Sequence, residues 1–155
     1  MESKTGQQFD EQANACKTLF SKKARDYGTS WRVYRTISVA DQIYIKAKRI
    51  RTIQEIKTQK IGDNIKSEFQ GIINYSIIGL IQLEINNDEP EQLNATELET
   101  LYTAKVKLAR QLMIEKNHDY GEAWREMSQE SLIDLSLAKI LRIRQIIAND
   151  GKTLV

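Results

Sequence analysis

KARDYGTSWRVYRTISVADQIYIKAKRIRTI at residues 23–53 and KNHDYGEAWREMSQESLIDLSLAKILRIRQI at residues 116–146 are the stretches that decide the expected fold. Aligned without gaps at an offset of 93 positions, they are identical at 13 of 31 residues. Both tryptophans of the chain fall opposite each other in this alignment, which chance does not readily produce. We therefore predict a tandem duplication, with two copies of one helical unit packed about a pseudo-two-fold axis.

The residues shared by the two copies are the candidate functional set, because they include aromatic, acidic and basic side chains. The main pairs are Asp26/Asp119, Tyr27/Tyr120, Gly28/Gly121, Trp31/Trp124, Arg32/Arg125, Ser38/Ser131, Asp41/Asp134, Lys46/Lys139, Arg49/Arg142 and Arg51/Arg144.

Composition limits the class of protein before any motif is considered. The chain has 155 residues, of which 28% are charged and 41% hydrophobic, and it has one proline, a composition typical of a globular domain rich in helix. The single cysteine excludes an intrachain disulfide framework and a cysteine zinc site, and the single histidine excludes a multi-histidine metal site. The net charge of +2 does not by itself indicate nucleic-acid binding.

The pattern of apolar and capping residues predicts an all-α helical bundle with a first unit at 1–86, a linker at 87–95 and a second unit at 96–155, sharing one core. Helices are expected at about 9–25, 38–57 and 63–85 in the first unit, and at 96–120 and 131–149 in the second. Glycines 28 and 121 are expected to end the first helix of each unit. Ser38 and Thr96, each three residues before an acid, are expected to begin helices.

The counterpart of the third helix would fall at positions 156–178, past the last residue shown. We therefore expect the second unit to lack its third helix here. A longer protein is the favoured explanation, and the alternative is a helix supplied by another subunit.

A lysine lies within the apolar arc of the second helix in each unit. Val39, Ile43 and Ile50 form that arc in the first unit, and Lys46 falls inside it, as Lys139 does in the second unit. A lysine on a covered face needs a partner charge. Two alternatives stay open: a structural ion pair with Asp26, Asp41 or Glu68, or a phosphate site that also uses Arg49 and, in the second unit, Arg142.

The third helix and the shared DYG-x-x-W-R motif each allow a structural and a functional interpretation. Residues 71–81 carry no charge, which predicts a helix surrounded by protein. Trp31 is either a core anchor or a ring that stacks on a base beside Arg32, and the same alternatives hold for Trp124 and Arg125.

These motifs, together with S-x-x-D…K-x-x-R-I-R and E-F-x-x-I-I-N-Y, resemble a bacterial family of unknown function, the nucleotide modification associated domain of the first type. The resemblance covers nearly the whole chain and implies a link to nucleotides. A more distant similarity is to the MazG-type all-α nucleoside triphosphate pyrophosphohydrolases, whose paired carboxylates hold Mg²⁺. Here Glu68 is followed at the third position by Gly71 and Asp41 by Tyr44, so each pair has one acid instead of two.

Two functions are weighed. In the first, a nucleotide is bound or hydrolysed between the second and third helices: Lys46, Arg49, Lys139 and Arg142 neutralise phosphates, Tyr27 or Trp31 (Tyr120 or Trp124) stacks the base, and Asp26, Asp41, Glu68, Asp119 or Asp134 holds any Mg²⁺. In the second, the chain is a non-catalytic helical module that assembles with itself or a partner. Direct binding to nucleic acid is disfavoured. No membrane span or signal peptide is visible, so a cytoplasmic protein is expected.

Overall fold

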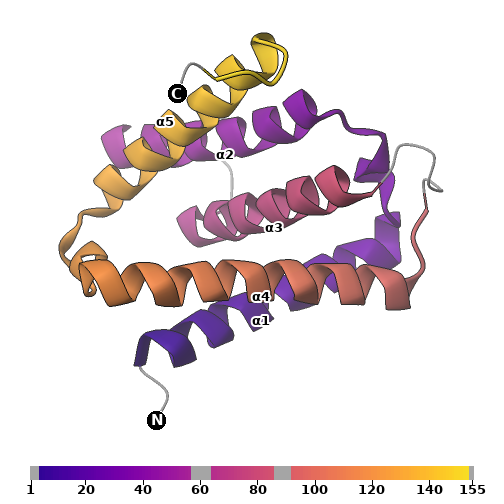
Figure 1. The fold of residues 1–155 in the computed structure, drawn as a ribbon, viewed down its shortest axis with the longest axis horizontal. Helices are drawn as coiled ribbons and strands as arrows, with labels where there is room; N and C mark the ends of the chain where they lie inside the picture. Colours follow the sequence, from indigo (N-terminus) through magenta and orange to yellow (C-terminus); the bar gives the residue numbers. More distant parts are fainter. Residues whose placement is uncertain (1–3, 57–63, 86–91, 154–155) are drawn as a thin grey trace. The chain divides into compact units, whose positions relative to one another are not determined.

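The structure is a computed structural model that describes residues 4–56, 64–85 and 92–153. In these ranges the backbone forms five α-helices and two short 3₁₀ helices, with no strand (Figure 1). In chain order they are α1 (Lys4–Tyr27), η1 (Ser30–Val33), α2 (Thr36–Ile56), α3 (Ile65–Glu84), α4 (Ala95–Tyr120), η2 (Ala123–Glu126) and α5 (Gln129–Ala148). The prediction of an all-α protein is confirmed.

Glycine ends α1 and α4, as predicted from the repeated Tyr-Gly pair. Gly28 and Gly121 follow the last helical residues and both have a φ of +64°. This left-handed conformation is accessible to glycine without the steric cost that other residues incur. The chain therefore turns out of both helices in the same way and continues into a 3₁₀ helix.

The predicted starts of α2, α4 and α5 are late by one or two residues, and α1 begins at Lys4, five residues before its predicted start. Ser38 lies inside α2, because that helix begins two residues earlier. The N-cap of α5 is Ser128, whose hydroxyl accepts a hydrogen bond from the backbone N–H of Ser131 at 3.1 Å. The N-cap of α4 is Asn94 and not Thr96. The predictions assumed that each helix begins at a serine or threonine three residues before an acid. In the structure each of these helices begins earlier in the chain than that residue.

The chain divides into two compact units, and each takes residues from both predicted repeat segments. The α1–α4 unit comprises residues 1–33 and 80–125, and the α2–α5 unit comprises residues 34–79 and 126–155. Division of the chain at a linker over 87–95 stays a prediction.

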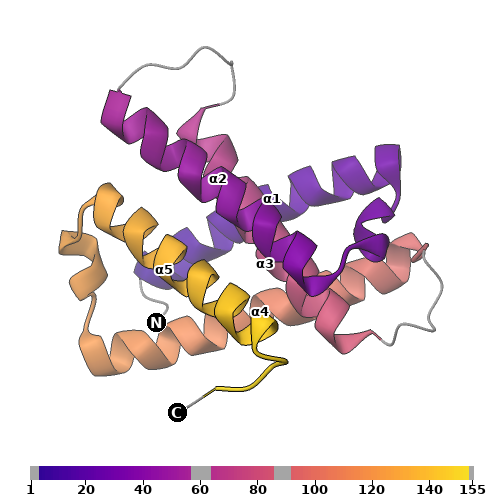
Figure 2. The ribbon, with the colours of Figure 1, turned by 90° about the horizontal axis from the view of Figure 1, so that it is seen from above.

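The α1–α4 unit is built on two antiparallel helices that lie side by side in both ribbon views (Figures 1 and 2). Its core contains Cys16 and an aromatic group in which the Phe20 ring lies 4.6 Å from the Tyr102 ring and 6.3 Å from the Trp31 ring, centroid to centroid. A two-pronged ion pair joins Arg110 of α4 to Asp10 of α1, with N···O distances of 2.8 and 3.0 Å.

In the α2–α5 unit, α2 packs antiparallel to α5 (Figure 2). The core of this unit is aliphatic. Ala47 and Ile50 of α2 pack with Ile133 and Leu137 of α5, and Phe69 of α3 packs against this cluster. The predicted apolar arc of α2 is confirmed, because Val39, Ile43 and Ile50 are all buried.

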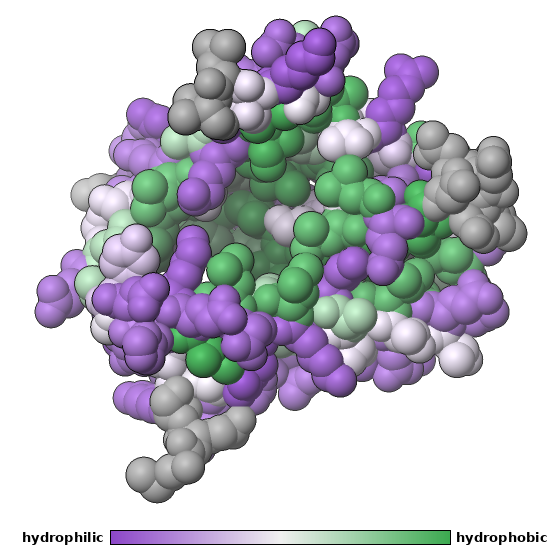
Figure 3. Space-filling model, viewed as in Figure 1, coloured by the Kyte–Doolittle hydropathy of each residue, from purple (hydrophilic) through white to green (hydrophobic). Residues whose placement is uncertain are grey.

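Helix α3 is less enclosed than its composition predicts. Ile73, Leu80 and Leu83 are 40%, 37% and 70% exposed, so the expectation of a helix surrounded by protein is wrong for the part of the chain that the structure describes. The absence of charged residues from a helix does not show which of its faces another element covers. Apolar residues accordingly reach the surface of the molecule, as Figure 3 shows for one face. Among the described helices, none is both long and apolar enough to cross a membrane.

Candidate functional site

The predicted cations of α2 meet a carboxylate of α3. Arg49 Nη1 lies 2.8 Å from Glu68 Oε1, and Lys46 Nζ lies 3.8 Å from Glu68 Oε2. Glu68 is buried, and both cationic side chains are about three-quarters covered. The structure thus favours Glu68 as the partner charge among the three acids considered. This ion pairing accounts for the buried cations without any ligand.

Close packing of α3 on α2 surrounds this ion cluster. A Cβ at Gly71 would lie 2.7 Å from Cδ of Lys46, so any larger residue would require the lysine side chain to shift. The Lys46 ammonium lies 5.7 Å from the centroid of the Tyr75 ring. Burial, together with a hydrogen bond to Tyr34, raises the pKa of Tyr75 above its ordinary value. The glycine of this face therefore serves helix packing.

The equivalent cations of α5 lie in a different environment. Lys139 and Arg142 are exposed, and the described residues supply neither of them with a carboxylate. The expectation of a covered lysine in both copies is therefore correct for Lys46 and wrong for Lys139. The physical reason is that α3 covers α2, whereas no described helix covers the same face of α5.

The predicted acids Asp41 and Asp134 join α2 to α5. Asp134 Oδ1 lies 3.6 Å from Arg51 Nη1, and Asp41 Oδ1 lies 3.6 Å from Arg144 Nε. The Arg144 guanidinium also lies over the Tyr44 ring, 5.0 Å from its centroid. Both acids therefore have arginine partners on the neighbouring helix of the same unit.

Trp31 and Arg32, from η1, are held inside the α1–α4 unit. Trp31 is 8% exposed and packs on Phe20. Gln82 accepts a hydrogen bond from Arg32 Nη1 and donates through Nε2 to the carbonyls of Trp31 and Arg32, both at 3.1 Å. Trp31 is therefore buried in the core of this unit, with the Phe20 ring tilted beside it.

Trp124 and Arg125, from η2, lie nearer the surface. Trp124 is 40% exposed, and the Arg125 guanidinium lies 4.6 Å from its ring centroid. Arg125 also contacts Glu122 at 3.0 Å and the hydroxyl of Thr5 at 2.7 Å. The hydrogen bond from Thr5 and the pairing with Arg125 lower the pKa of Glu122.

The remaining predicted residues lie at the exposed ends of α1 and α4. Tyr27 and Tyr120 are 70% and 76% exposed, and Asp26 and Asp119 are also exposed. Asp119 Oδ1 lies 3.0 Å from the ring nitrogen Nδ1 of His118. The predicted residues therefore lie in several places. Lys46 and Arg49 meet Glu68, and Asp41 and Asp134 meet arginines of the neighbouring helix.

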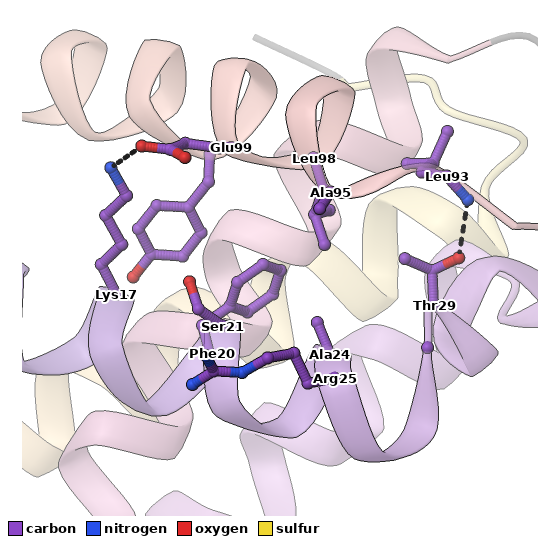
Figure 4. A pocket seen from close by; sticks show the side chains of 12 residues that line it. Lys17, Phe20, Ser21, Ala24, Arg25, Thr29, Leu93, Ala95, Leu98 and Glu99 are labelled. Atoms are coloured by element: carbon purple, nitrogen blue, oxygen red, sulfur yellow. Dashed lines mark hydrogen bonds and ion pairs between the residues drawn. The ribbon is translucent and has the colours of Figure 1, made fainter.

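A pocket of about 330 Å³ lies in the α1–α4 unit, between its two long helices (Figure 4). Its lining comprises Lys17, Phe20, Ser21, Ala24, Arg25, Gly28, Thr29, Leu93, Ala95, Leu98, Glu99 and Tyr102. The small side chains of Ser21, Ala24 and Ala95 leave the space open, and the two aromatic rings lie in its lining.

Both positively and negatively charged side chains line the pocket beside its apolar residues. Lys17 Nζ lies 3.0 Å from Glu99 Oε1 and donates to the Thr103 hydroxyl at 3.1 Å. Arg25 is exposed, and its guanidinium extends along α1 past Ser21 in Figure 4. With two cations and one carboxylate, the lining has a net positive charge.

The chain segment after α1 completes the pocket. Thr29 is 2% exposed, and its hydroxyl accepts a hydrogen bond from the backbone N–H of Leu93 at 3.1 Å. The backbone N–H of Thr29 donates to Gln92 Oε1 at 3.2 Å. These bonds tie the residues before α4 to the end of α1 and so fix the wall of the pocket beside Gly28.

Sequence reasoning missed this pocket, although a signal was present. The α1 lining residues recur at positions 17, 20, 21, 24, 25 and 28, and those of α4 at 95, 98, 99 and 102, which is the spacing of one helix face. Small residues within both faces, Ser21 and Ala24 on α1 and Ala95 at the start of α4, were the indication of a space. The repeat alignment concealed it, because Arg25 is opposite His118 and therefore not a repeated residue.

The described residues contain no group of three or more histidine, cysteine, aspartate or glutamate side chains placed to hold a metal ion. The paired carboxylates of the MazG-type comparison are likewise incomplete at Gly71 and Tyr44.

Comparison with protein families identifies the relationship. The model of the family described as nucleotide modification associated domain 1 matches residues 23–83 and 116–155, well over half of the chain. The chain belongs to the nucleotide modification associated domain 1 family. No similar curated protein and no similar solved structure was found. The family description associates this domain with nucleotide modification and states no reaction.

Proposed function

We propose that this member of the nucleotide modification associated domain 1 family binds a nucleotide in the pocket between α1 and α4. The observation that carries the proposal is the pairing of an aromatic and apolar lining with an exposed cation, Arg25, on one pocket of suitable size. The family description supports a nucleotide as the ligand.

The chemistry of the lining suits the two parts of a nucleotide. The planar base would lie against Phe20, Tyr102 and Leu98, since base–aromatic contacts contribute about 1–3 kcal/mol each. The phosphate would lie towards Arg25, because a guanidinium binds phosphate oxygens through two parallel N–H groups. Lys17 is less available, because it already contacts Glu99.

The direct test is thermal-shift and calorimetric titration of the full chain with nucleoside mono-, di- and triphosphates, with and without Mg²⁺. We expect Arg25→Gln to weaken binding about tenfold, which corresponds to the loss of one charge-assisted hydrogen bond. Ala24→Leu fills the pocket and is expected to abolish binding. Phosphate or pyrophosphate release in the same samples tests hydrolysis separately.

Lys22→Gln is the matched control, because it removes one positive charge from the same helix at an exposed residue outside the lining. If both Lys22→Gln and Arg25→Gln weaken nucleotide binding equally, the loss of affinity comes from the change in net charge and not from a contact with Arg25. Binding that survives Ala24→Leu, or the absence of binding by every nucleotide tested, would contradict the proposal.

We also propose that the chain is a tandem duplication arranged about a pseudo-two-fold axis. The ion pairs Arg51–Asp134 and Arg144–Asp41 are reciprocal, since each arginine and each aspartate occupies the equivalent position of the other repeat segment. Such reciprocity is the property of contacts across a two-fold axis. The same offset of 93 positions separates the ends of α1 and α4, the two 3₁₀ helices, and the starts of the two matched family segments, which supports the same interpretation.

A second candidate function is a non-catalytic helical module that assembles with a partner. The observation favouring it is that Glu68 already pairs with Lys46 and Arg49, which makes the cations of α2 part of the packing. Titration by ultracentrifugation of the full chain would show whether it self-associates. A monomer at every concentration would leave only a heterologous partner for this candidate.

A further inference from the structure

One face of α5 lacks the cover that the equivalent face of α2 has. In α2, Val39 and Ile50 are 4% and 0% exposed. The α5 residues at the equivalent positions, Leu132 and Ile143, are 37% and 41% exposed. The two helices do not differ in exposure where they pack on each other, because Ala47 and its counterpart Ile140 are both buried. Val39 lies against Gly79 of α3, whereas Ile50 belongs to the cluster that packs on α5, so the difference includes the face of α2 that α3 covers.

The contacts of α3 with α2 show which side chains fit against this face. Gly79 of α3 approaches Val39, so that a Cβ there would lie 3.3 Å from Val39 Cγ1, and Gly71 leaves room for the stem of Lys46. Glu68 then pairs with both cations of the face. An apolar helix with small residues and one carboxylate is thus complementary to this pattern of side chains.

The face of α5 presents the same pattern without a cover. Leu132 and Ile143 flank Lys139 and Arg142, and all four side chains are exposed. Covering Leu132 and Ile143 would remove their apolar surface from water, so an open face of this kind favours association.

We propose that this α5 face (Leu132, Lys139, Arg142 and Ile143) is the docking site for a partner helix of the α3 type, which is mainly apolar and has a carboxylate, equivalent to that of Glu68, that pairs with Lys139 and Arg142. The proposal rests on the proposed duplication and is independent of the nucleotide pocket. Two copies of the face do not fit each other, because that contact would bring four cations together without a carboxylate.

The probe is a fluorescein-labelled, end-capped peptide with the sequence of residues 64–85, titrated into the full chain and followed by fluorescence anisotropy. We expect saturable binding. We expect it to weaken at least tenfold when the peptide carries Glu68→Gln, and at least tenfold when the protein carries Lys139→Glu. A peptide with Glu68→Lys is expected to bind the Lys139→Glu protein more tightly than the unchanged peptide does.

Two controls make the result specific to α5. Lys107→Glu makes the same charge change at an exposed residue of α4 and is expected to leave binding unchanged. A peptide that instead replaced α3 on α2 would respond to Arg49→Met and not to Lys139→Glu, because Arg49 forms the short contact with Glu68, and that result would overturn the proposal. Absence of saturable binding would also overturn it, whereas nucleotide titrations of the pocket would be unaffected by either outcome.

Discussion

Glu68 is the residue whose replacement most directly tests how the α2–α3 contact is stabilised. Its side chain is 10% exposed and accepts from Arg49 at 2.8 Å, while Lys46 lies 3.8 Å away. Glu68→Gln keeps the size of the side chain but leaves two cations beside each other without a carboxylate. Breaking a buried ion pair costs about 3–5 kcal/mol.

The cost at this position is expected to fall below that range, because the two cationic side chains keep about a quarter of their surface in water. We therefore expect Glu68→Gln to lower the free energy of unfolding by about 2–3 kcal/mol. Arg49→Met should cost about 2 kcal/mol, since it removes a charged hydrogen bond. Lys46→Met should change stability by less than about 1 kcal/mol, because methionine has similar volume and the long Lys46–Glu68 contact contributes little.

Urea unfolding followed by far-UV circular dichroism measures these differences, and the double variants measure the coupling between the partners. Glu55→Gln is the matched control, since Glu55 forms an exposed pair with Arg51 and should cost less than about 0.5 kcal/mol. The reasoning fails if Lys46→Met destabilises as much as Glu68→Gln, or if Glu68→Gln costs no more than Glu55→Gln.

Two further predictions concern the α1–α4 unit. Gly28→Ala and Gly121→Ala both place a side chain at a φ of +64° and should each cost about 1–2 kcal/mol, but Gly28→Ala should cost more, because its Cβ would lie 2.6 Å from the Gln92 amide whereas Gly121 has open space. Equal losses in urea unfolding would contradict this. Burial raises the pKa of Tyr102, so its neutral form stabilises the fold below the ordinary tyrosine pKa of about 10, and this contribution is lost as pH rises further. Tyr102→Phe should therefore show a shallower loss of stability above about pH 10 than the unchanged chain, and identical pH profiles would refute the assignment.

Much of the backbone could be predicted from local sequence because its causes are local. The glycine of each Tyr-Gly pair determines where α1 and α4 end, and both ends are confirmed. Helix starts were less predictable, since several residues near each start can accept the first backbone N–H groups. Asn94 and Ser128 serve as caps, although Thr96 and Ser131 are followed by acids at the expected spacing.

The candidate pocket and the openness of α3 depend on which faces meet, and a single helix does not carry that information. The space beside Ala24 and Ala95 arises because small residues of two helices face each other, 71 positions apart in sequence. The exposure of Leu83 reflects the same limit, since an apolar residue is buried only where another element covers it.

The repeated residues show most clearly how far identity of sequence predicts role. Trp31 is 8% exposed and packs in an aromatic core, whereas its counterpart Trp124 is 40% exposed beneath a guanidinium. Lys46 is covered by α3, whereas Lys139 is exposed. In each pair the same side chain sits on the same kind of helix, so the difference comes from the neighbouring element and not from the residue. A shared residue in this chain therefore predicts a shared capacity, and whether that capacity serves packing or binding is decided by what lies opposite it.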